Sequence, residues 1–63
     1  DKYYIEKNVN GESLILDDGS IYKVYDDLIS SLWNEFDEVI VTGDGNQIIN
    51  LETRESVEVI QVE

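Results

Sequence analysis

The stretch LILDDGSIYKVY, residues 14–25, consists of two short apolar-rich runs on either side of an Asp-Gly turn. An Asp-Gly pair between two such runs is among the strongest short-range signals for a β-hairpin. Leu14 and Leu16 share one face of the first run, and Tyr22 and Val24 share one face of the second. We therefore predict a hairpin here, against which the rest of this short chain packs.

The segments outside the hairpin also alternate with a period of two, which is typical of half-buried strands. We predict strands at residues 2–9, 12–16, 21–25, 38–42, 47–51 and 56–62. Asn10-Gly11 suits the tight turn between the first two of them. In the last run the apolar phase slips after Val59, which predicts a β-bulge or a bend there.

Between residues 25 and 36 the period changes, and apolar side chains recur three and four residues apart, as on a helix face. Asp26 or Asp27 is suited to be the N-cap, while two consecutive serines weaken the helix interior. We expect one short helix between residues 26 and 34, with Trp33 and Phe36 buried on its apolar stripe.

These elements predict an all-β fold, a small barrel of five or six antiparallel strands with one short helix, in a single domain spanning residues 1–63. The expected core consists of the apolar positions that face one side of each element: Leu14, Leu16, Tyr22, Val24, Leu32, Trp33, Val39, Val41, Ile49, Leu51, Val57 and Val59.

The composition limits the possible partners and cofactors. Fifteen acidic residues face four basic ones, for a net charge of −11, so we expect no binding to nucleic acid and favour a protein partner with a basic surface. The absence of Cys and His excludes disulfides and thiolate or imidazole metal sites. We expect no cofactor, and no apolar run is long enough for membrane insertion.

The chain begins at Asp1 instead of Met, which is compatible with a removed signal peptide, a removed tag or a neighbouring domain. Cytoplasmic and exported locations therefore both stay open, and the sequence does not determine the oligomeric state.

Three segments carry a familiar pattern. They are residues 18–24 (DGSIYKV), 33–41 (WNEFDEVIV) and 49–57 (INLETRESV). The pattern resembles that of small SH3-like barrel domains of uncharacterised bacterial proteins, over roughly residues 14–59. Phe36 and Arg54 stand where that pattern carries glycine, and Tyr22 stands where it carries Trp. The resemblance implies an SH3-like barrel and no particular activity.

No catalytic constellation is evident, because the serines have no His or Cys partner, and we expect no enzyme. The short acidic loops lack the ligand spacing of a dedicated calcium site, so we predict no metal site. The candidate partner-binding residues are acidic positions around the predicted helix, joined by two tyrosines expected on outer faces: Asp26, Asp27, Glu35, Asp37, Glu38, Tyr4 and Tyr25.

Three functions remain open from the sequence. The first is a non-catalytic binding or accessory module that contacts a protein partner through its acidic surface. The second is a nucleic-acid-mimicking inhibitor of a DNA- or RNA-binding protein, of the phage anti-defence type. The third is a structural module of a larger envelope protein.

Overall fold

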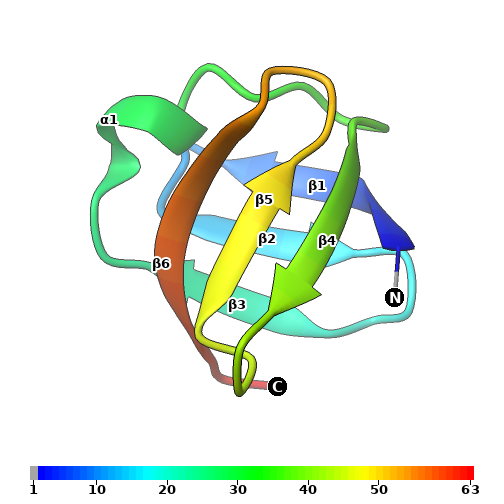
Figure 1. Ribbon diagram of the computed structural model, residues 1–63, viewed down its shortest axis with the longest axis vertical. Helices are drawn as coiled ribbons and strands as arrows, with labels where there is room; N and C mark the ends of the chain where they lie inside the picture. Colours follow the sequence, from blue (N-terminus) through cyan, green and yellow to red (C-terminus); the bar gives the residue numbers. More distant parts are fainter. Residues whose placement is uncertain (1) are drawn as a thin grey trace.

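The computed structural model describes residues 2–63, and Asp1 lies outside the described residues. Within them the chain forms six strands and one single-turn helix (Figure 1). The elements are β1 (Lys2–Val9), β2 (Ser13–Leu16), β3 (Ile21–Val24), α1 (Asp27–Ser30), β4 (Glu38–Thr42), β5 (Gln47–Asn50) and β6 (Glu55–Gln61). The predicted strands and the position of the helix are thus confirmed, with small differences at their ends.

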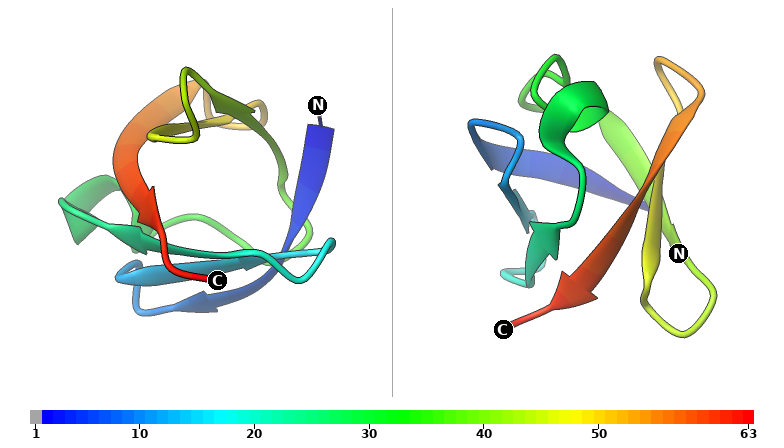
Figure 2. Two further views of the ribbon diagram at one scale, coloured as in Figure 1. Left: turned by 90° about the horizontal axis from the view of Figure 1, so that it is seen from below. Right: turned by 90° about the vertical axis from the view of Figure 1, so that its left-hand side faces the viewer.

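The strands form a closed antiparallel barrel in the order β1-β2-β3-β6-β5-β4, the small SH3-like barrel that the sequence predicts. Figure 2 (left) shows the strands around the interior. The buried apolar side chains fill this interior. The longest strands, β1 and β6, each pair with one neighbour in each of the two sheets and so belong to both halves of the barrel. Closure leaves no strand of this ring with an unpaired edge.

The irregularity that lets a strand turn the barrel corner lies in β1, where the pairing with β2 shifts between Ile5 and Lys7. In β6 the pairing has no register shift, so the bulge alternative of the prediction was wrong, but the predicted bend is confirmed, because β6 pairs with β5 up to Glu58 and with β3 from Val59 onward. The last apolar residues, Ile60 and Val62, do not re-enter the core but stay about half exposed. Val57 and Val59 face inward, and Ile60 and Val62 are apolar residues at outward positions of the same regular alternation.

The two predicted hairpin turns are present. Asn10 and Gly11 both adopt positive φ, at 55° and 74°, as a type I′ turn requires. A Cβ at Gly11 would also collide with the backbone of Ser31, so this turn is the point where the β1–β2 hairpin touches the end of α1. In the second turn the Asp18 carboxylate accepts hydrogen bonds from the hydroxyl and the N–H of Ser20, at 2.6 and 3.0 Å.

The core largely matches its prediction. The buried apolar side chains are Ile5, Leu14, Leu16, Tyr22, Val24, Trp33, Val39, Ile48, Val57 and Val59, with Tyr3 and Val41 packed partly against them. Two predicted core positions in and after β5 were wrong, since Ile49 and Leu51 are only partly buried and Ile48 and Asn50 face inward instead. Because Ile48 and Ile49 are consecutive apolar residues, the apolar–polar alternation does not determine which side of β5 faces inward.

The predicted burial of the helical stripe was wrong for most of its members. Trp33 is buried at 3% exposure, but Leu32 and Phe36 are 78% and 76% exposed. The physical reason is the length of the helix, because a single turn from Asp27 to Ser30 presents only one side to the barrel. The chain then leaves the helical path and crosses the end of the barrel toward β4 (Figure 1).

Candidate protein-binding surface

A polar network fastens α1 to the barrel. The fully buried Ser30 donates its hydroxyl to the carbonyl of Gly11 at 2.6 Å. Asn8 donates its amide to the carbonyls of Ser30 and Trp33, both at 2.9 Å, and accepts from the Gly11 N–H. Buried polar groups are stabilising when they are satisfied in this way. This network therefore helps to fix the position of α1 on the barrel.

Trp33 is the apolar anchor of the same segment. Its ring enters the core, and its indole N–H donates to the carboxylate of Glu55 at 3.0 Å. Filling the end of the barrel with one large side chain removes the need for the neighbouring apolar residues to be buried.

Three large side chains close to Trp33 are consequently left outside. Leu28, Leu32 and Phe36 are each more than three-quarters exposed, at 77%, 78% and 76%. Single exposed apolar residues are ordinary, but three of them within nine residues form an unusual concentration. Sequence reasoning missed them as surface residues because their spacing indicates a buried helix face.

Phe36 is unusual in a second respect, because its φ of 73° lies in the left-handed region that bulky side chains avoid. The conformation is held by the backbone, since the Phe36 N–H donates to the Ile5 carbonyl and the Ile5 N–H donates to the Asp37 carbonyl, at 2.6 and 3.0 Å. Arg54 also has positive φ, at 63°. Both residues stand where the resembled pattern carries glycine. A left-handed conformation is costly for a bulky residue, so the surrounding backbone bonds must hold Phe36 in place.

The charge around these side chains has one sign. No Lys or Arg occurs between Lys23 and Arg54, while the segment carries Asp26, Asp27 and Glu35. We define the helix–loop surface as the apolar side chains Tyr25, Leu28, Leu32 and Phe36 together with the carboxylates of Asp26, Asp27 and Glu35. It combines apolar anchors with exclusively negative charge.

The structure divides the predicted site residues into two groups. Tyr25, Asp26 and Asp27 lie together at the start of α1, where the Asp26 carboxylate caps the helix by accepting from the Leu28 N–H at 3.1 Å. Tyr4 and Glu38 are a cross-strand pair of β1 and β4, and Asp37 directly precedes Glu38 in this second group. Figure 1 shows α1 and the start of β4, which carry these two groups, at opposite ends of the loop that crosses the barrel.

In the second group the carboxylates have structural partners. Asp37 accepts from the Asn34 N–H and from the side-chain amide of the fully buried Asn50, both at 3.0 Å. Glu38 forms an ion pair with Lys2 at 3.8 Å. The carboxylates of Asp37 and Glu38 therefore help to hold the start of β4 in place. Glu35, between the two groups in sequence, is exposed.

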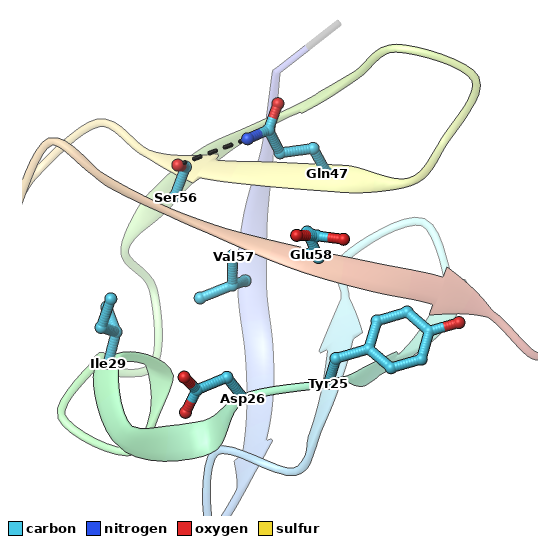
Figure 3. A pocket seen from close by; sticks show the side chains of 7 residues that line it. All are labelled: Tyr25, Asp26, Ile29, Gln47, Ser56, Val57 and Glu58. Atoms are coloured by element: carbon cyan, nitrogen blue, oxygen red, sulfur yellow. Dashed lines mark hydrogen bonds between the residues drawn. The ribbon is translucent and has the colours of Figure 1, made fainter.

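A shallow groove of about 290 Å³ opens beside the first group, between α1, β5 and β6 (Figure 3). Tyr25, Asp26 and Ile29 form one side, and Val57 and Glu58 form the other. Sequence reasoning missed the β6 side, because nothing in the periodicity indicates that α1 packs beside this strand.

A second, only partly exposed apolar area lies on the outer side of β2, β3 and β6. Ile60 is opposite Lys23 in the strand pairing, and Ile15 is opposite both Ile21 and Lys7. This sheet face carries lysines, so it differs in charge from the helix–loop surface.

Neither a metal centre nor a membrane span is found in the part of the chain that the structure describes. Residues 2–63 contain no group of three or more acidic residues arranged to hold a metal ion. They also contain no helix long and apolar enough to cross a membrane. No family model, no curated protein and no solved structure matches the chain.

Proposed function

We propose that this domain is a non-catalytic binding module that docks on a basic protein surface through its helix–loop surface. The observation that carries the proposal is the exposure of Leu28, Leu32 and Phe36 on a segment that holds its place without them. Buried aromatic and aliphatic anchors supply most of the affinity at protein interfaces.

The carboxylates of the surface contribute in a different way. Asp27 and Glu35 attract a cationic partner over a distance, which raises the association rate and makes it dependent on salt. A net charge of −11 strengthens this field around the whole domain. The apolar anchors therefore govern how long a complex lasts, and the charge governs how fast it forms.

The proposal is tested by selecting binders from a displayed library of random peptides, with the domain as bait. We expect the selected peptides to combine Lys or Arg with apolar residues. The double variant Leu32→Ser/Phe36→Ser should lose at least tenfold in affinity for them, because two anchors are removed. Its melting temperature should change little, since both side chains are exposed.

The matched control is Ile60→Ser/Val62→Ser, which removes two half-exposed apolar side chains on the lysine-bearing sheet face. It should bind the peptides as tightly as the parent. A selection that yields no binder, or binders that the Leu32/Phe36 variant holds equally well, would overturn the proposal. If the Leu32/Phe36 variant still binds, and binding is lost only when carboxylates of the domain are neutralised, the result would instead favour nucleic-acid mimicry.

A further inference from the structure

We infer that the groove between α1 and β6 binds the guanidinium of an arginine side chain from the partner, an assignment that rests on the proposed binding function and names the chemistry of one contact. Figure 3 shows the groove with a tyrosine ring, two carboxylates and two aliphatic side chains around it. These are the groups that a cation with an apolar stem requires.

The aromatic and acidic groups are held next to each other by the backbone. The Tyr25 N–H donates to the Glu58 carbonyl at 3.1 Å, which places Tyr25, directly after β3, next to Glu58 of β6. Both side chains are exposed, Tyr25 at 71%. A planar guanidinium can stack on the tyrosine ring while its N–H groups donate to the carboxylate beside it.

Asp26 supplies the second carboxylate from the α1 side. One of its oxygens, Oδ1, accepts from the Leu28 N–H at 3.1 Å, which fixes the side chain and leaves Oδ2 as an acceptor. Within residues 2–63 neither Asp26 nor Glu58 forms an ion pair, since the Lys2–Glu38 contact is the one found there. The negative charge of the groove is therefore not neutralised by the domain itself.

The remaining groups set the size and polarity of the groove. Ile29 and Val57 provide an apolar wall for a methylene stem, and Gln47 donates to the Ser56 hydroxyl at 3.4 Å on the β5–β6 side. Ligand pockets usually span roughly 300–1,000 Å³. A groove of about 290 Å³ lies just below that range, which fits one side chain and not a large cofactor.

The test is a titration of the full chain with N-acetyl-arginine methylamide, followed through the backbone amide resonances. We expect weak saturable binding, with dissociation constants on the order of millimolar, and shifts centred on Tyr25, Ile29 and Glu58. The lysine analogue should bind more weakly, and the neutral citrulline analogue should give no saturable shift.

The variants Glu58→Gln and Tyr25→Leu should each weaken arginine binding about two- to fivefold. Glu52→Gln removes the same charge in the exposed β5–β6 turn and should leave binding unchanged. Shifts spread evenly over the acidic residues, an equal effect of Glu52→Gln and Glu58→Gln, or equal affinity for lysine would overturn the assignment. The peptide experiment with the Leu32/Phe36 variant does not depend on this outcome, so the two proposals fail separately.

Discussion

Replacing Phe36 by glycine and by alanine tests the strained backbone at the centre of the helix–loop surface. Both variants remove an exposed ring, and they differ by one methyl group. At an ordinary position a glycine variant is less stable than the alanine variant by about 0.5–1 kcal/mol, because glycine gives the unfolded chain more conformational freedom. At the φ of 73° found for Phe36, an L-residue is destabilised by about 1–2 kcal/mol.

The two effects have opposite signs at Phe36, and the conformational strain is the larger. We therefore expect Phe36→Gly to be more stable than Phe36→Ala by about 0.5–1 kcal/mol. Leu28 is the matched control, since it is equally exposed but lies within α1. There the order should reverse, with Leu28→Gly less stable than Leu28→Ala by about 1 kcal/mol.

The assay is urea denaturation of the four variants, supported by thermal melting. A difference of 1 kcal/mol corresponds to about 4–8 °C in melting temperature for a domain of this size. If Phe36→Gly is less stable than Phe36→Ala, which is the order expected for the two Leu28 variants, then Phe36 does not hold a left-handed conformation.

Other predictions concern the core, the turns and the charge. Trp33→Ala should cost about 3–5 kcal/mol in urea denaturation, and a variant melting within a few degrees of the parent would show that the ring is not core. Gly11→Ala should be clearly destabilising in the same assay because of its φ of 74° and the contact with Ser31, and unchanged stability would contradict that close approach. The pKa of Asp18 is lowered, mainly by the hydrogen bond from the Ser20 hydroxyl and next by that from the Ser20 N–H. The resulting stabilisation of the fold is present above the unfolded pKa of about 3.9 and is lost as the pH falls through the lower pKa of the folded state. Ser20→Ala should raise the pKa of Asp18 in an NMR titration, and an unaltered titration would exclude the hydroxyl as the cause. Added salt should raise the melting temperature by screening a net charge of −11, whereas a fall at moderate salt would show that repulsion is unimportant.

The strands were predictable because their turns carry strong local signals. Asn10-Gly11 and Asp18-Gly19 fix the first two hairpins, and alternation then identifies the inward side of β2, β3 and β4. In β5 this reasoning failed, because Asn50 is buried in place of its apolar neighbours. Its side chain accepts from the N–H groups of Glu52 and Thr53 at 2.8 and 3.1 Å and donates to Asp37, so its burial is compensated by bonds that no periodicity reveals.

The candidate surface was predicted only in part. Asp26 and Tyr25 were identified from capping chemistry and from their outward phase, both of which are local. The exposure of Leu32 and Phe36 was not predictable from spacing, because α1 ends after a single turn. The end of this turn is held by the bond from Ser30 to the Gly11 carbonyl, nineteen residues away in sequence, which local periodicity does not reveal. The one available signal was Phe36 itself, a bulky residue where the resembled pattern carries glycine.

The measurement that bears most directly on the binding function is amide chemical-shift mapping of the full chain with a selected basic peptide. The shifts should be concentrated in residues 25–36, with the largest at Leu32 and Phe36, and they should weaken as salt is added. Shifts concentrated instead around Ile15, Ile21 and Ile60 would place binding on the lysine-bearing sheet face and contradict the role of the helix–loop surface.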